Sequence, residues 1–151
     1  MRNGRRIAFD YGDVRIGVAM SDASGLLATP HGVIDSQGDF LAEISLLITE
    51  FEPIYFAVGI PRHLSGSASS KMDSVEGFIS SLAKFNLPII RIDERLTTVS
   101  ASRSLRESGK TAKESKSFID AAAAALILEM ALNQERGQSQ VIDEIGPEQH
   151  E

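Results

Sequence analysis

The chain has 151 residues, 42% of them hydrophobic, and a formal net charge of −6. This length suits one domain with its own apolar core. The absence of cysteine excludes disulfide bonds and thiolate metal sites, and it is typical of a reducing cytoplasm. No apolar run approaches the ~20 residues that a membrane span needs. Because Asp10 and Asp13 interrupt the first apolar run, it does not predict a secretory signal, and we expect a cytoplasmic protein without a membrane partner.

The first third of the chain predicts three strands. Residues 6–11 form a short apolar run, and Gly12 with Asp13 indicates a turn. Residues 16–20 predict a second strand, which would form a hairpin with the first. A third strand over residues 26–34 contains Pro30, which lacks a backbone N–H. We therefore expect this strand at an edge of the sheet.

Helices and strands then alternate. Apolar residues at helical spacing predict a helix over residues 40–51, with Asp39 as its N-cap. The apolar run 55–60 predicts a central strand, and the Ser- and Gly-rich residues 61–70 a polar loop. The same patterns predict four further elements: a helix over 75–85, a strand over 89–92, a helix from Thr97 or Thr98 to 108, and a helix over 118–133 capped by Ser117.

This order of elements predicts an α/β fold, a ribonuclease H-like mixed five-stranded sheet flanked by helices. Actin-like ATPases share that architecture, but the chain is too short for the two lobes that enclose ATP. We expect the domain to cover residues 1–134. Residues 135–151 are acidic and lack periodicity, which predicts a disordered C-terminal tail.

Acidic residues follow or open several of these segments. Asp10 ends the first strand, where it could enter a cleft or bond the amides of its own turn. Asp93 and Glu94 follow the strand over 89–92, and strand alternation favours Glu94 as the residue that faces the cleft. Asp120 lies three residues after Ser117, a spacing that by itself favours a capping box, although an acid near the start of this apolar helix would also suit a metal ligand projected across the sheet. A group of carboxylates beside a core predicts a Mg²⁺ or Mn²⁺ site.

Basic residues suggest contact with a phosphate backbone. Arg15 opens the second strand, across the turn from Asp10, and could pair with an acid, a phosphate or the surface. Residues 103–116 hold five bases and two acids, among them Lys110 and Lys113. Such a stretch can bind nucleic acid or be a solvated helix face.

Four blocks together resemble the YqgF (RuvX) family, whose members are known as Holliday junction resolvases and pre-16S rRNA nucleases. In order they are IAFDYGDVRIGVAMSD, FAVGIPRHLSG, IDERLTTVSA and IDAAAAALILEMAL. The match runs from about Arg6 to Asn133. The chain departs from the family pattern at Val14, in the loop over residues 65–70, and at Glu76, where a basic residue is common.

The resemblance implies a nuclease cleft in which Asp10, Glu94 and Asp120 are the catalytic and metal-binding acids for one or two Mg²⁺ or Mn²⁺ ions. It also implies that Arg15, Thr97 and Thr98 lie near the substrate. Lys110 and Lys113 join them as candidate substrate-binding residues.

The expected activity is metal-dependent cleavage of structured nucleic acid, foremost 5′-end processing of pre-16S rRNA on pre-ribosomal particles. The alternatives are a Holliday junction resolvase and a non-enzymatic nucleic-acid-binding relative. The protein would be a monomer or a homodimer.

Overall fold

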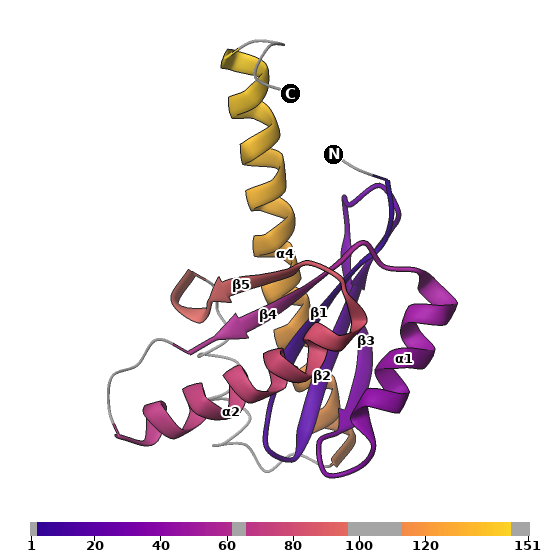
Figure 1. Cartoon of the computed structure of the whole chain (residues 1–151), viewed down its shortest axis with the longest axis vertical. Coiled ribbons are helices and arrows are strands. Elements are labelled where there is room, and N and C mark those ends of the chain that lie inside the picture. The colour runs from indigo at the N-terminus through magenta and orange to yellow at the C-terminus, as the bar shows by residue number, and fades with distance from the viewer. Residues whose placement is uncertain (1–2, 62–65, 97–112, 146–151) are drawn as a thin grey trace.

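A computed structural model of the chain describes residues 3–61, 66–96 and 113–145 (Figure 1). Five strands form one sheet in the order β3-β2-β1-β4-β5. β1 pairs with β2, and β2 with β3, in antiparallel fashion, whereas β1 with β4 and β4 with β5 are parallel. The mixed five-stranded sheet predicted from the sequence is therefore confirmed. The strands are β1 (Arg6–Tyr11), β2 (Arg15–Ser21), β3 (Ala28–Asp35), β4 (Tyr55–Ile60) and β5 (Ile89–Asp93).

The edge position expected for the Pro30 strand is also confirmed. β3 pairs only with β2 within the described sheet, and its register shifts between Val18 and Ala19, which lie opposite Gly32 and Pro30. An edge strand tolerates both features because one of its two sides donates no ladder hydrogen bonds.

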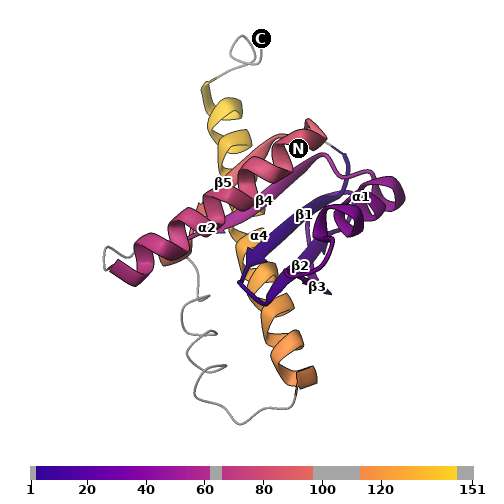
Figure 2. The same ribbon diagram turned by 60° about the horizontal axis from the view of Figure 1, so that its bottom comes forward.

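Helices cover both faces of the sheet (Figures 1 and 2). α1 (Phe40–Phe51) and α2 (Gly66–Leu82) lie on one face, and α4 (Lys113–Ile145) crosses the other. Asp39 caps α1 as predicted, because its carboxylate accepts a hydrogen bond from the amide of Ala42 at 3.1 Å. Two short 3₁₀ turns, η1 (Ala83–Phe85) and η2 (Glu94–Leu96), flank β5. Over the residues described, no helix is both long and apolar enough to cross a membrane.

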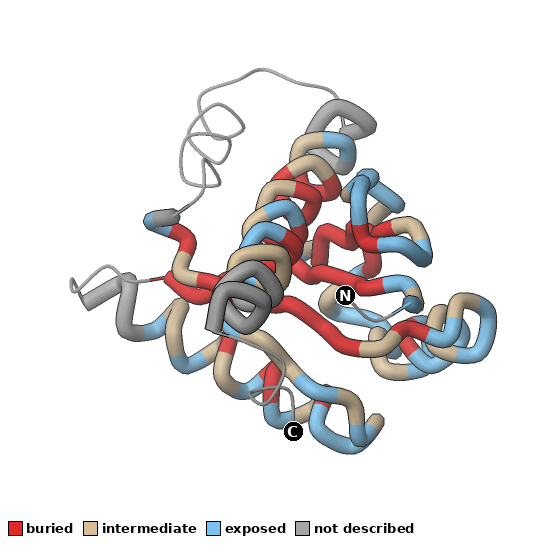
Figure 3. Tube along the Cα trace, turned by 90° about the horizontal axis from the view of Figure 1, so that it is seen from above, coloured by how far each residue is buried: buried red, intermediate tan, exposed pale blue. Residues whose placement is uncertain are grey.

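Strand alternation creates two different cores. In β1, Ile7 and Phe9 pack with large side chains on the side of α1 and α2, whereas Ala8 packs toward α4. The α4 side is built largely from alanines of both the sheet and the helix. Figure 3 shows the buried residues of α4 on the side that faces the sheet. Small side chains let this helix approach the strands closely.

Two predicted segments differ from the structure. α2 begins at Gly66, so residues 66–70 are helical and the expected loop over 61–70 is wrong for them. This end of α2 projects beyond the sheet (Figure 2), so it has no core to face. Its residues are polar and therefore lack the apolar periodicity from which a helix is predicted. The expected helix over 97–108 lies outside the described residues.

The last helix is much longer than predicted. α4 starts at Lys113, before Ser117, and continues to Ile145. Residues 135–145, where the sequence predicted a disordered tail, are therefore helical, and the boundary at residue 134 stays a prediction. An established helix extends at little cost per residue, even where no apolar stripe faces a core.

Glu135, immediately beyond the expected boundary, holds α4 to the sheet. Its carboxylate binds the guanidinium of the fully buried Arg6 at 2.9 Å and accepts the Tyr55 hydroxyl at 2.6 Å. Burial and this carboxylate both raise the pKa of Tyr55 above its usual value. The two partners lie on β1 and β4, so one carboxylate connects α4 to two neighbouring strands.

We expect Glu135→Ala to lower the free energy of unfolding by about 3 kcal/mol, because it leaves the buried Arg6 charge without its carboxylate. Urea denaturation would measure the change. Glu129→Ala, an exposed position on the same helix, is the matched control and should change stability by less than about 0.5 kcal/mol. Equal effects of the two substitutions would contradict this role of Glu135.

Candidate active site

Asp10 lies near the carboxyl end of the central strand β1. It is 3% exposed and lies opposite Gly17 of the antiparallel neighbour β2. Alternation places it on the same face as Ala8, which packs toward α4. On its other side, β1 and β4 run parallel with Phe9 opposite Val58, and this register continues to place Asp10 beside Gly59. Asp10 therefore has a glycine on each side, and α4 packs directly on both glycines, through the Asp120 backbone at Gly17 and the Ile127 side chain at Gly59.

Glu94 follows β5 and reaches the space above Gly59. It is 4% exposed, and its Oε1 atom lies 3.4 Å from where a Cβ on Gly59 would stand. The Ile127 side chain of α4 would lie closer to that Cβ, at 2.5 Å, so the glycine makes room for the helix, and the Glu94 carboxylate packs beside it.

Asp93 points to a different partner. Its carboxylate accepts from the Arg95 backbone amide at 2.9 Å and forms an ion pair with the Arg95 guanidinium at 2.8 Å. Of the two adjacent acids, Glu94 is the buried one, as strand alternation predicted.

Asp120 reaches the same region from α4. It is 4% exposed, and its Oδ2 atom accepts a hydrogen bond from Nε of Arg15 at 2.7 Å. Its backbone lies against Gly17: a Cβ on that glycine would overlap the Asp120 carbonyl oxygen and lie 2.5 Å from its carbonyl carbon. Since Gly17 is the partner of Asp10, the helix places Asp120 beside the other flank of Asp10.

The capping box predicted for Ser117 and Asp120 is wrong. α4 begins at Lys113, so Asp120 lies in the helix interior rather than in its first turn. Its buried carboxylate pairs with Arg15 on β2. The tertiary partner, rather than the local cap, accounts for the acid at this position.

The three acids therefore gather around two glycines at one end of the sheet. Gly17 adjoins Asp10 and Asp120, and the Glu94 carboxylate lies in van der Waals range of a Cβ on Gly59, the next position of β4 after Val58, which pairs with Phe9. Each acid is at least nine-tenths buried, and burial of several carboxylates in one place is costly unless cations or hydrogen bonds compensate.

Carboxylate oxygens are the ligands that Mg²⁺ and Mn²⁺ prefer, so the donor set fits a hard divalent cation. Their arrangement is not that of a formed site: in the described ranges, no group of three or more His, Asp or Glu side chains is placed to hold a metal ion. A cation would require these side chains, or the Arg15 partner of Asp120, to rotate.

The candidate substrate-binding residues are only partly covered. Arg15 lies at the site, through its contact with Asp120. Lys113 is the first residue of α4, and its side chain is outside the described part, as are Thr97, Thr98 and Lys110.

Sequence reasoning missed Lys71. Its Nζ on α2 donates to the carbonyl of Tyr11, the residue after Asp10, at 2.7 Å. A lysine in a helix gives no sequence signal that it contacts a strand end 60 positions earlier. The contact adds a positive charge close to the acidic site.

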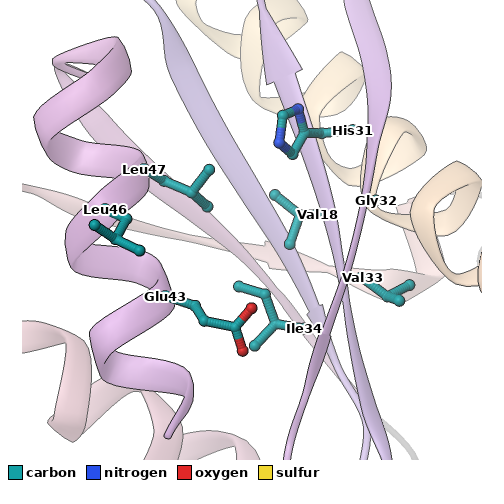
Figure 4. Close-up of a pocket in the computed structure, with 8 residues that line it drawn as sticks. All are labelled: Val18, His31, Gly32, Val33, Ile34, Glu43, Leu46 and Leu47. Atoms are coloured by element: carbon teal, nitrogen blue, oxygen red, sulfur yellow. The ribbon is translucent and has the colours of Figure 1, made fainter.

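The well-formed pocket of Figure 4 lies elsewhere. It has a volume of ≈ 330 Å³ and lies between α1 and β3. Val18, Ile34 and Leu47 line it, and Glu43 is its one acid. It opens on the α1 face of the sheet, opposite the face that carries the three acids, so it is not part of their site.

Comparison with solved structures identifies the architecture. RuvC of Thermus thermophilus in complex with a Holliday junction substrate is similar over 89% of this chain and 96% of that chain, with a TM-score of 0.59 and 17% identity. A second T. thermophilus RuvC structure has a TM-score of 0.50 and 16% identity, over 88% and 96%. The fold is ribonuclease H-like, as the order of elements predicted.

The profile of the family described as "RuvX: Holliday junction resolvase" matches residues 4–134, and the chain belongs to this family. Its relatives include proteins named "Putative pre-16S rRNA nuclease". That of Streptomyces coelicolor is 46% identical over 90% of this chain and 84% of its own length. That of Streptomyces avermitilis is 45% identical over 90% of both chains. The family resemblance inferred from the four sequence blocks is confirmed.

We expect Gly17→Ala to destabilise the protein by about 2 kcal/mol, because the added methyl group overlaps helix backbone that no rotamer change can move. Thermal and urea unfolding would measure the loss. Gly32→Ala on the adjacent strand is the control, since nothing lies within 4 Å of its Cβ position, and it should change stability by less than about 0.5 kcal/mol. A Gly17→Ala protein as stable as that control would contradict the close packing of α4.

Proposed function

We propose that this protein is a divalent-metal-dependent endonuclease of structured nucleic acid, and that its substrate is the 5′ end of the 16S rRNA precursor. The observation that carries the proposal is the burial of three acids, Asp10, Glu94 and Asp120, at the end of the sheet where β1 pairs with Gly17 and α4 packs on it. A purely structural role would not require three acids at one sheet edge, where their mutual repulsion opposes folding.

In this proposal the three carboxylates hold Mg²⁺ or Mn²⁺. A bound divalent cation would polarise a phosphoryl oxygen and offset the charge that develops on the leaving oxygen. The protein supplies the rest. Asp10 and Glu94 extend from strand ends and Asp120 from a helix packed on glycine, so their backbones are fixed before the substrate arrives. Arg15 supplies a guanidinium, which suits a phosphate oxygen.

Lys71 contributes a second positive charge close to the site, through its contact with the Tyr11 carbonyl. Thr97 and Thr98 remain proposed substrate contacts on the strength of the family resemblance, and Lys110 and Lys113 because they lie in the basic stretch 103–116. Together these groups would offset the formal charge of −6 that otherwise opposes the approach of nucleic acid.

The similarity to pre-16S rRNA nucleases, at 46% and 45% identity over most of each chain, favours the RNA substrate. Such an enzyme would act in the cytoplasm on pre-ribosomal particles. The family description favours a second candidate, Holliday junction resolution. That reaction needs two active sites on paired strands and therefore a two-fold dimer, whereas a monomer suffices for rRNA processing.

Asp10→Asn and Glu94→Gln should each reduce metal-dependent cleavage by more than about 100-fold. Loss of a residue that only supports a metal ligand costs up to about 100-fold, and loss of a proposed ligand itself should cost more. Asp93→Asn is the matched control, because Asp93 adjoins Glu94 but pairs with Arg95. It should retain most of the activity. Cleavage rates with Mn²⁺, Mg²⁺ and EDTA would test this. Undiminished cutting by Asp10→Asn, from a folded protein, would rule out the proposed site.

A 5′-extended 16S rRNA precursor and a four-way DNA junction, cut side by side, distinguish the two substrates. We expect metal-dependent cutting of the rRNA precursor, abolished by Asp10→Asn, and a monomer in analytical ultracentrifugation. Cutting of the junction alone, by a dimer, would replace the rRNA proposal with the resolvase. Salt-sensitive binding without any product would indicate a non-enzymatic relative instead.

A further inference from the structure

One carboxylate of the candidate site already has a cation. Nε of Arg15 donates to Oδ2 of Asp120 at 2.7 Å, a short, charge-assisted hydrogen bond. The Asp120 side chain is 5% exposed and that of Arg15 is 23% exposed. The guanidinium thus occupies one oxygen of an acid that a divalent cation would need. A metal ion would also be repelled by the positive charge of Arg15 at so short a range.

We propose that Arg15 is a built-in counter-ion of the metal-free protein, which must leave Asp120 before a divalent cation binds there. The released guanidinium then contacts a phosphate of the nucleic acid. The inference rests on the proposed function, since it concerns the same three acids. It adds that metal binding and the release of Arg15 to the substrate are coupled.

The structure indicates which partner of the pair moves. The Asp120 backbone is held against Gly17, where there is no room even for a methyl group, so α4 cannot shift toward β2. Arg15 is the first residue of β2, directly after the turn that contains Gly12 and Asp13. It has a long side chain, and part of that chain reaches solvent. The packing therefore permits the Arg15 side chain to rotate away from Asp120, whereas it holds the Asp120 backbone in place.

The guanidinium also has donors to offer a phosphate. Within the part of the chain that the structure describes, Arg15 donates a hydrogen bond through Nε. Its two Nη groups can therefore donate to another acceptor, such as a phosphate oxygen. A planar guanidinium binds phosphate oxygens through two parallel hydrogen bonds. The same side chain can therefore hold Asp120 in the absence of metal and the substrate in its presence.

This exchange makes metal and nucleic acid bind cooperatively. Metal releases Arg15 for the phosphate, and a phosphate that holds Arg15 leaves Asp120 available to the metal. Linkage requires each ligand to raise the affinity for the other by the same factor. In the absence of nucleic acid, the Arg15–Asp120 pair reduces the apparent metal affinity by the fraction of molecules in which the pair is open.

Calorimetric titration with Mn²⁺ tests the competition without any turnover. Arg15→Gln should bind Mn²⁺ about tenfold more tightly than the wild type, because the Arg15 guanidinium no longer competes with the metal ion for Asp120. Arg95→Gln is the matched control: it also removes one positive charge next to an acid of this region, but its partner is Asp93. It should change Mn²⁺ affinity by less than about twofold, as expected for an exposed pair.

A second titration measures the coupling. In the wild type, Mn²⁺ should strengthen the binding of a non-cleavable RNA analogue, and the analogue should strengthen the binding of Mn²⁺ by the same factor. In Arg15→Gln this mutual gain should be reduced or lost, while Arg95→Gln retains it. Unchanged coupling in Arg15→Gln would overturn the handover of Arg15 to phosphate.

A measurement on the wild type covers the case in which Arg15→Gln does not fold. The Nε–H resonance of Arg15, followed by NMR during a Mg²⁺ titration, should shift as the bond to Asp120 opens. Metal binding that leaves this resonance unchanged would overturn the proposal. So would a folded Arg15→Gln protein with wild-type or weaker Mn²⁺ affinity, or an equal gain in Arg95→Gln, which would indicate only general electrostatics.

These outcomes are separable from failure of the proposed function. Metal-dependent cleavage with unaltered Mn²⁺ affinity in Arg15→Gln would retain the nuclease and remove only the role of Arg15 as competitor. Absence of both Mn²⁺ binding and cleavage in the wild type would overturn both.

Discussion

The close approach of α4 to the sheet is the constraint on which the rest of the structure depends. Gly17 leaves no room for a side chain against the Asp120 backbone, and the alanines of both surfaces form the core between them. This packing fixes the position of Asp120 relative to β1 and β2. Farther along α4, Glu135 binds Arg6 and Tyr55. This ion pair and hydrogen bond hold the helix to the sheet in addition to the packing of small side chains.

The two faces of the sheet have different roles as a result. Large aliphatic and aromatic side chains fill the side covered by α1 and α2, and they contribute most of the apolar burial. On the α4 side, glycines let the helix backbone and the Ile127 side chain pack directly on the strands, and the carboxylates of Asp10 and Glu94 are buried there as well. Stability and the candidate chemistry are thus separated across one sheet, which lets acids be buried without disrupting the larger core.

Positive side chains compensate part of the charge of the buried acids. Arg15 pairs with Asp120, and Lys71 contacts the carbonyl of Tyr11, next to Asp10. These cations offset part of the repulsion among the acids. The same positive groups are suited to phosphate, so the features that stabilise the folded protein and those proposed to bind nucleic acid involve the same side chains.

The sequence by itself determined the strands, the capped helix α1, the edge position of β3 and the burial of Glu94 rather than Asp93. All of these follow from local periodicity, from proline chemistry or from strand alternation. It did not determine the start of α2, the extent of α4, the partner of Asp120 or the contacts of Lys71 and Glu135. The contacts of Asp120, Lys71 and Glu135 join residues that lie 60 to 129 positions apart and meet only when the helices pack on the sheet. Local patterns contain no record of such meetings, so the tertiary structure alone decided them.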